Sequence, residues 1–237
     1  MERVKTGSVS AERLYEYVEK NTYESESKRG YECIKRIFDF VSSFALGIVL
    51  IIPCVIIAAI IFITDPGNPF YVQKRVGKDG KIIKMVKFRS MVKNADDLKN
   101  ILTAEQYKQY KKEFKLDNDP RLLPHNIGKY IRKLSLDELP QILINICIKG
   151  DMSVVGPRPI LQEELELNYT PEQRRILTSV KPGLTGYWQA YARNNAGYEN
   201  GVRQNMELYY VENRGVWMDI KILCKTVVSV IKRTGAQ

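Results

Sequence analysis

Two adjacent carboxylates, Asp137 and Glu138, stand inside the motif SLDELPQ, which begins at Ser135 and is typical of a helix start. A helix start keeps a carboxylate ionised at neutral pH and directs backbone donors toward a nearby phosphate. Asp137 is therefore a candidate nucleophile toward phosphorus. The motif also has a purely structural explanation, because Ser135 and Glu138 have capping-box spacing and acidic residues in a first turn complement the helix dipole.

Cationic groups that could assist such an attack occur on both sides of this motif. An anion that approaches a pyrophosphate is repelled, so the reaction needs Mg²⁺ and Arg or Lys side chains to neutralise the developing charge. Arg132 precedes the carboxylates, and Arg158 follows them in the rigid turn GPRP. A planar guanidinium suits phosphate oxygens, although such a turn is also typical of a surface loop.

The composition limits other kinds of chemistry. With 37 Lys and Arg against 27 Asp and Glu, the chain of 237 residues has a formal charge of +10, which predicts an acidic partner such as nucleic acid, anionic lipid or a phosphorylated substrate. His125 is the single histidine, which argues against a Ser-His-Asp hydrolase. The four cysteines have none of the spacings that hold zinc or a redox disulfide, so we expect them to be reduced.

Residues 41–63 form a run of 23 residues without a charge, bounded by Asp39 and Asp65. A helix of this length spans roughly 30 Å of hydrocarbon, so the sequence predicts a membrane-bound protein. The run follows about forty mostly polar residues and lacks a small-residue cleavage site, which argues against a signal peptide.

Basic residues flank both ends of this run, including Lys35 and Arg36 before it and Lys74 and Arg75 after it. Because cytoplasmic segments are rich in Lys and Arg, both ends have a cytoplasmic character. Pro53 removes one backbone donor near the middle and favours a bend. The pattern fits a re-entrant helix that enters and leaves by the same leaflet, and it also fits a kinked single span.

The remaining patterns are mainly helical. Residues 70–88 have the pattern of a β-hairpin around an Asp-Gly turn. Amphipathic helices are indicated at residues 98–114, after Thr170, and near the C-terminus, where a basic helix with an apolar face fits either a membrane surface or the protein core. The predicted fold is therefore mainly α with a short β-hairpin (α+β).

Seven motifs occur in the order found in the bacterial sugar transferase family, which the chain resembles from about residue 33 to residue 233. The motifs lie at residues 75–77, 87–91, 119–121, 135–141, 149–153, 156–159 and 182–186. This family comprises monotopic phosphoglycosyl transferases that act on polyprenyl phosphate. Seven ordered motifs are far more specific than any one of them.

The resemblance implies an enzyme that transfers a sugar phosphate from a UDP-sugar to polyprenyl (undecaprenyl) phosphate and releases UMP. It implies that Asp137 attacks the sugar-linked phosphate and carries a covalent sugar phosphate until the acceptor takes it. Asp137 and Glu138 would hold a required Mg²⁺, and Glu138 could also act as a base for the acceptor. The residues that match phosphate-binding positions are Arg132 and Arg158, with Lys87 and Arg89 as further candidates.

The resemblance also implies a location. It favours a re-entrant helix bent at Pro53, interfacial amphipathic helices, and an active site at the lipid boundary on the cytoplasmic face of the bacterial inner membrane. We expect the compact form of the family, in which this reaction is the first membrane step of polysaccharide assembly. The expected parts are a polar extension at residues 1–30, the membrane helix at 31–65 and a membrane-associated catalytic domain at 66–237.

Two other interpretations compete with this one. The chain could be a membrane-anchored module whose basic hairpin binds nucleic acid or acidic lipid, or an inactive scaffold of polysaccharide assembly. Nucleic-acid binding does not require carboxylates paired with Arg132 and Arg158, so no nucleic-acid partner is predicted. One departure from the family pattern is a segment at residues 141–149 that is about two residues longer than expected.

Overall fold

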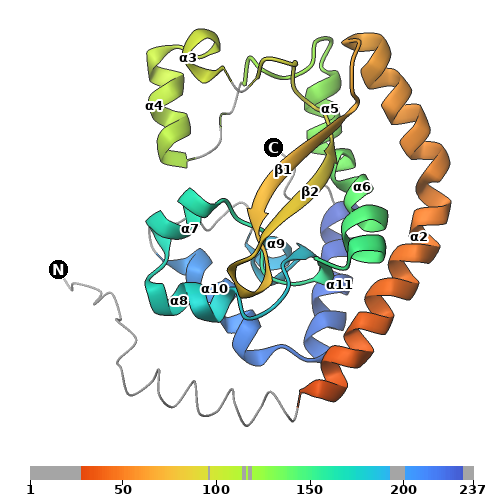
Figure 1. Cartoon of the computed structure of the whole chain (residues 1–237), viewed down its shortest axis with the longest axis vertical. Helices are drawn as coiled ribbons and strands as arrows, with labels where there is room; N and C mark the ends of the chain where they lie inside the picture. Colours follow the sequence, from red (N-terminus) through yellow and green to blue (C-terminus); the bar gives the residue numbers. More distant parts are fainter. Residues whose placement is uncertain (1–27, 96, 114–115, 117–118, 193–200, 232–237) are drawn as a thin grey trace.

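The computed structural model describes residues 28–95, 97–113, 116, 119–192 and 201–231. Within these ranges helices dominate and two small two-stranded sheets are present, so the predicted mainly α fold with a β-hairpin is confirmed. The polar extension expected at residues 1–30 lies almost entirely outside them. Figure 1 shows the hairpin near the centre, with the long helix α2 along one side and shorter helices on the other.

Along the chain, the hairpin follows the long helix and precedes the other α-helices. The α-helices are α2 (Arg29–Thr64), α3 (Leu98–Ile101), α4 (Ala104–Glu113), α5 (Ile127–Lys133), α6 (Leu139–Gln141), α7 (Gln162–Asn168), α8 (Pro171–Leu177), α9 (Tyr187–Tyr191), α10 (Val202–Asn213) and α11 (Val216–Ile231). The 3₁₀ and π-helical segments are η1 (Lys78–Gly80), η2 (Leu136–Glu138) and η3 (Ile142–Lys149). The strands are β1 (Phe70–Val76), β2 (Ile82–Phe88), β3 (Ser153–Val155) and β4 (Gly183–Thr185).

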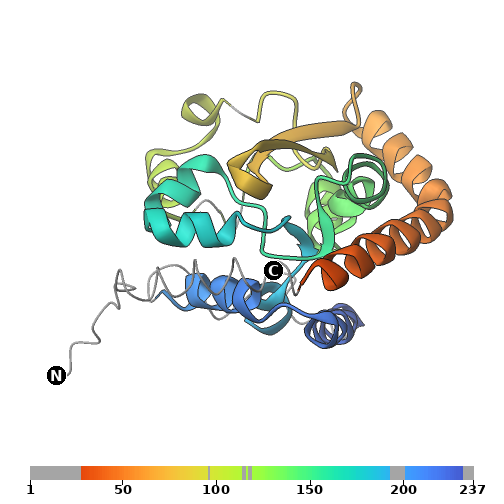
Figure 2. The same ribbon diagram turned by 60° about the horizontal axis from the view of Figure 1, so that its bottom comes forward.

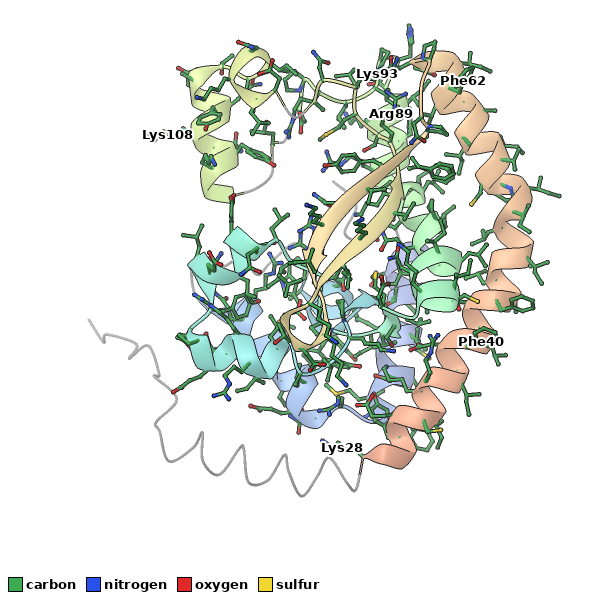
Figure 3. All side chains as sticks on the ribbon, in the orientation of Figure 1. Lys28, Phe40, Phe62, Arg89, Lys93 and Lys108 are labelled. Atoms are coloured by element: carbon green, nitrogen blue, oxygen red, sulfur yellow. The ribbon has the colours of Figure 1, made fainter. Side chains whose placement is uncertain are left out.

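Helix α2 turns an apolar face outward. Phe40 and Phe62 project from it away from the rest of the molecule (Figure 3). The hydroxyls of Ser42 and Ser43 donate to carbonyl oxygens about one turn earlier, so these polar groups are satisfied within the apolar helix. Within the described residues, this is the helix that is long and apolar enough to cross a membrane.

Helix α2 is continuous and changes direction along its length (Figure 2). Pro53 lies inside it, where proline removes a backbone hydrogen bond and favours bending. Near the start of the helix, the Arg36 guanidinium donates to the Ile146 carbonyl at 2.8 Å, and just after its end Asp65 pairs with Arg89. Both ends of α2 are therefore bonded to the same globular body.

The hairpin forms as the sequence predicts. β1 and β2 pair antiparallel, with Tyr71 opposite Lys87. At the turn Asp79 and Gly80 both have positive φ, 56° and 73°, the conformation for which an Asp-Gly pair is favoured. This register fixes the position of Lys87 near the end of β2.

The segment that we expect to be longer than the family pattern contains the π-helix η3. A π-helix has more residues per turn than an α-helix because its hydrogen bonds join residues five apart, so it accommodates additional residues in a similar length. Gly150 ends it with a φ of 62°, in the left-handed region that glycine adopts without strain. The sequence predicted a helix here but not this type.

Three clusters of buried apolar side chains hold the elements together. The largest lies among β3, α7, α8, α10 and α11, the second joins α2 to β2 and α5, and the third lies between β2 and η3. The parallel pair of β3 and β4 was not predicted. Each of these strands has three residues, which is too short to show a period of two in the sequence.

Helix α11 turns much of its predicted apolar face outward. Ile220, Val227 and Val228 are exposed, and Trp217 at the start of the helix is 77% exposed. Ile222 forms the buried side instead. The helix thus packs on the core through Ile222 and leaves an exposed apolar face, and a membrane-surface setting for that face stays a prediction.

We predict that Gly128→Ala destabilises the fold. A methyl group on Gly128 would lie against the carbonyl oxygen of Ser90 and 2.6 Å from the backbone nitrogen of Leu123. Because backbone must shift to relieve this overlap, the free energy of unfolding should fall by about 1–3 kcal/mol, measured by thermal unfolding in detergent. The control is Gly30→Ala, where the added methyl group meets no atom within 4 Å and the change should stay below about 1 kcal/mol. Equal effects would contradict the close packing of α5.

Candidate active site

The carboxylate motif adopts a tighter geometry than the predicted helix start. Ser135 has a left-handed backbone with a φ of 53°, and the chain continues through η2, α6 and η3. The predicted capping box is wrong, because Ser135 makes no side-chain cap and Glu138 accepts a hydrogen bond from Lys87 instead. Asp137 and Glu138 lie in the first turn, as predicted.

Two leucines hold this turn against the apolar helix α2. Leu136 and Leu139 flank the carboxylates and pack on the buried cluster that includes Ile61 of α2 and Phe88 of β2. Apolar burial therefore fixes the turn between α2 and the hairpin. The carboxylates are held next to the apolar helix as a result.

Lys87 of β2 lies between the two carboxylates. Its Nζ is 2.9 Å from Oε1 of Glu138 and 3.8 Å from Oδ2 of Asp137, whose side chain is 15% exposed. Neighbouring carboxylates repel each other when they are shielded from water, and an ammonium group offsets part of this repulsion. Three of the predicted site residues are thus brought together.

Burial raises the pKa of Asp137 to about 6, above that of an ordinary aspartate. The charge of Lys87 lowers this pKa, the charge of Glu138 raises it, and the charge of Arg132 lowers it. A carboxyl group with this pKa is mostly ionised at pH 7, as predicted. Its pKa lies closer to neutral pH than the pKa of a carboxylate at an exposed helix start would.

Arg132 reaches the same site from α5. It acts on Asp137 through its charge, and its Nη1 is 3.8 Å from Oδ2 of Asp119. Asp119 accepts two hydrogen bonds from the buried Arg121 side chain, at 2.7 and 2.6 Å. Since Arg132 is 44% exposed, its guanidinium is accessible to a phosphate. Asp119 and Arg121 belong to a family motif, but the sequence did not indicate this supporting role.

Arg89 lies at the C-terminal end of α2 (Figure 3). Its guanidinium donates to the side chain and the carbonyl of Asp65, and its Nε donates to the Asn68 carbonyl at 3.0 Å. These bonds fasten the end of α2 to the residues that follow the hairpin. A phosphate-binding role for Arg89 stays a prediction.

Arg158 belongs to a second charged cluster, built around Glu164 of α7. Glu164 accepts a hydrogen bond from Arg158 at 2.9 Å and pairs with Arg203 at 3.3 Å and with Arg75 at 3.6 Å. The Arg203 guanidinium also lies over the ring of Trp188, 4.2 Å from its centroid. These contacts connect Arg158 to α7 and α10, and its phosphate-binding role stays a prediction.

Burial perturbs ionisation in this second cluster. It lowers the pKa of Arg75 to about 10, and the charge of Arg158 acts in the same direction. It raises the pKa of Glu207 to about 7, against the charge of Arg203. Glu207 also accepts a hydrogen bond from the Arg158 backbone N–H at 3.1 Å. No sequence motif marks Glu164 or Glu207, because each lies in a helix with many other polar residues.

The carboxylate pair suits a hard divalent cation. Mg²⁺ prefers oxygen ligands and usually takes one or two carboxylates from the protein, together with water and substrate phosphates. The described part of the chain contains no group of three or more His, Cys, Asp and Glu residues that could enclose a metal. Asp137 and Glu138 fit the simpler arrangement, and Mg²⁺ stays a prediction.

We predict opposite changes in the pKa of Asp137 when its two neighbours lose their charges. Lys87→Met removes a cation that lowers this pKa, so it should rise above about 6. Glu138→Gln removes an anion that raises the pKa, so it should fall below about 6. Carbon-detected NMR titration of labelled carboxyl groups measures both values. Shifts in the same direction would contradict the described arrangement of charges.

Comparison with known proteins identifies the family. The sequence model of the bacterial sugar transferase family matches residues 30–233. A UDP-galactose-lipid carrier transferase of Erwinia amylovora is 42% identical over 213 residues, which cover 89% of this chain and 43% of the relative. An undecaprenyl-phosphate galactose phosphotransferase of Salmonella typhimurium shows the same identity and coverage. An exopolysaccharide production protein of Rhizobium meliloti is 38% identical over 206 residues, or 85% of this chain and 87% of the relative.

The extent of these matches differs between relatives. The chain spans less than half the length of the first two and most of the third. The family match includes Lys87, Asp137 and Glu138 and extends over nearly all of the described residues. This chain belongs to the bacterial sugar transferase family.

Proposed function

We propose that this chain is a phosphoglycosyl transferase that moves a sugar phosphate from a UDP-sugar to polyprenyl (undecaprenyl) phosphate and releases UMP. The observation that carries the proposal is the partly buried pair of Asp137 and Glu138, which lies beside Lys87 and within reach of the charge of Arg132. Two relatives are named as a lipid-carrier transferase and an undecaprenyl-phosphate phosphotransferase, which supports this substrate class.

In the first step, the Asp137 carboxylate attacks the phosphorus that bears the sugar. A bond forms between an Asp137 oxygen and this phosphorus, the bond to the bridging pyrophosphate oxygen breaks, and UMP leaves with that oxygen. In the second step, a phosphate oxygen of the acceptor attacks the same phosphorus. The bond to Asp137 then breaks, which restores the carboxylate and yields a sugar joined to the polyprenyl chain through a diphosphate.

The charges around Asp137 suit this role. With a pKa of about 6, the carboxylate is mostly ionised at neutral pH and more basic than an ordinary aspartate, which favours nucleophilic attack. Lys87 and Arg132 provide positive charge that reduces the repulsion between the carboxylate and the pyrophosphate. Mg²⁺ held by Asp137 and Glu138 would neutralise further phosphate charge.

The membrane helix is proposed to be re-entrant. A straight helix of 36 residues is about 54 Å long, and crossing roughly 30 Å of hydrocarbon would carry its ends to opposite sides of the bilayer. The bonds of Arg36 and Asp65 instead tie both ends to one body, and Pro53 lies between them. This arrangement supports a helix that enters and leaves by the same leaflet.

A re-entrant α2 would bring the carboxylates to the lipid boundary, where an acceptor with a membrane-embedded tail can present its phosphate. Leu136 and Leu139 already hold the carboxylate turn against α2. Lys35 of α2 pairs with Asp219 of α11 at 2.5 Å, which ties the exposed Trp217 region to the same helix. The charge of +10 suits the anionic cytoplasmic face of the bacterial inner membrane.

The two other interpretations explain less of the site. A basic binding module has no need of partly buried carboxylates, which cost free energy to keep away from water. An inactive scaffold has no need of a nucleophile with cations placed against it. Release of UMP from a UDP-sugar separates the enzyme from both alternatives.

We predict that mass spectrometry of the enzyme, after incubation with a panel of UDP-sugars and Mg²⁺, detects a sugar phosphate on the peptide that contains Asp137. Asp137→Ala should abolish this adduct and lower the rate of UMP release at least about a thousandfold. Asp97→Ala is the matched control, because Asp97 is an exposed aspartate at the start of α3 and its loss should leave both readouts unchanged. An active Asp137→Ala enzyme would overturn the proposed mechanism.

The re-entrant helix predicts that residues at its two ends are accessible from the same side of the membrane. Cys33 is exposed near the start of α2, and Pro66→Cys places a thiol just after its end. In variants that keep a single cysteine, a membrane-impermeant maleimide should label both positions in inverted vesicles and neither in right-side-out vesicles. Labelling of the two positions from opposite sides would indicate a single span.

A further inference from the structure

We infer that Asn145 is a positioning residue that fastens the strand carrying Lys87 to the helical segment that follows the carboxylate pair. The inference deepens the proposed function and rests on it for its catalytic consequence. It starts from the open edge of β2, the strand that ends one residue after Lys87.

In an antiparallel pair, every second residue points its N–H and C=O groups away from the partner strand. On β2, Lys84 and Val86 turn these groups toward the π-helix η3, where Asn145 meets them. The Val86 N–H donates to Oδ1 of Asn145 at 3.0 Å, and Nδ2 of Asn145 donates to the Lys84 carbonyl at 2.9 Å. The Asn145 carboxamide therefore pairs with β2 as the backbone of a third strand would.

Asn145 is suited to this role because its side chain is shielded from water, so water cannot replace its hydrogen-bond partners. The residue is fully buried, and its second Nδ2 hydrogen is donated to Asp151 at 3.0 Å. An amide that is satisfied in this way and shielded from water resists displacement, because breaking its bonds leaves buried polar groups unpaired. The bond between β2 and η3 is therefore a rigid one.

This bond bears directly on the active site. Lys87 follows Val86 on β2, and the carboxylates precede η3 in the continuous helical run from Leu136 to Lys149. The Asn145 side chain thus adds two directional bonds to the apolar packing between these elements, and together they set the distance between the ammonium group and the two carboxylates. A shift of about 1 Å in such a group can reduce catalysis by about a hundredfold.

The π-helical form of η3 decides which of its side chains face the hairpin. Its hydrogen bonds join residues five apart, so successive side chains are rotated about the helix axis differently than in an α-helix. In η3 the buried side consists of Ile142, Asn145, Ile146 and Cys147. Asn145 is the polar member of that side, and its partners are backbone groups rather than solvent.

The test compares Asn145→Ala with Asp151→Ala in the full-length protein. Asn145→Ala removes both carboxamide bonds to β2 and loosens the strand near Lys87, so the side chain of Lys87 should react several-fold faster with an N-hydroxysuccinimide ester, read by peptide mass spectrometry. Asp151→Ala removes one hydrogen bond from the same network but keeps both bonds to β2, so the reactivity of Lys87 should stay at the wild-type value. Lys129 and Lys133, exposed on α5, should react equally in all three proteins.

The catalytic consequence is measured per active molecule. The amount of sugar phosphate trapped on the enzyme counts active sites, and the turnover of each remaining site should fall about tenfold or more in Asn145→Ala. A merely structural role would reduce the number of active sites and leave the turnover of each site unchanged. Unchanged reactivity of Lys87 in Asn145→Ala, or unchanged turnover per site, would overturn the inference.

These outcomes are separable from failure of the proposed function. A wild-type protein that traps no sugar phosphate with any UDP-sugar would contradict the transferase activity, and with it the catalytic part of the inference. The reactivity of Lys87 needs no substrate and still decides whether Asn145 holds this lysine in place.

Discussion

Two neighbouring carboxylates can both stay ionised in a site shielded from water only when positive charge is held against them. Lys87 supplies that charge at the shortest distance, and Arg132 adds to it from α5. The rest of the architecture serves this balance. The hairpin carries the lysine, the Leu136 and Leu139 contacts carry the carboxylates, and Asn145 joins the two parts. Burial still raises the pKa of Asp137 to about 6, which suits the nucleophilic role proposed for this residue.

The second constraint is that the polar site must remain attached to an apolar helix. Hydrophobic contact alone is weakly directional, so polar side chains define how α2 sits on the body. Arg36 bonds to a carbonyl of η3, and Asp65 bonds to Arg89 after β2. Both bonds end on elements that also position the carboxylate pair. Helix α2 and the carboxylate site are therefore parts of one packed unit.

Features set by local rules could be predicted from the sequence. The Asp-Gly turn between two strand-forming runs defines the hairpin, and Thr170 and Gln173 form the predicted capping box at the start of α8. The same rule failed at Ser135, because Lys87 competes for the Glu138 side chain and is distant in sequence. The arginine cluster around Glu164 was missed for a similar reason. Its members come from β1, α7, α10 and the turn after β3, and only the folded chain brings their charges together.

The proposed re-entrant seating of α2 would also affect the lipid around its outward face. A helix bound at both ends to a body on one side would displace lipid mainly from the nearer leaflet and would crowd that leaflet without adding area to the other. Such a helix would have no span to match to the hydrocarbon thickness, which is the variable that sorts transmembrane helices between membranes. Its insertion would depend instead on the lateral packing of a single leaflet.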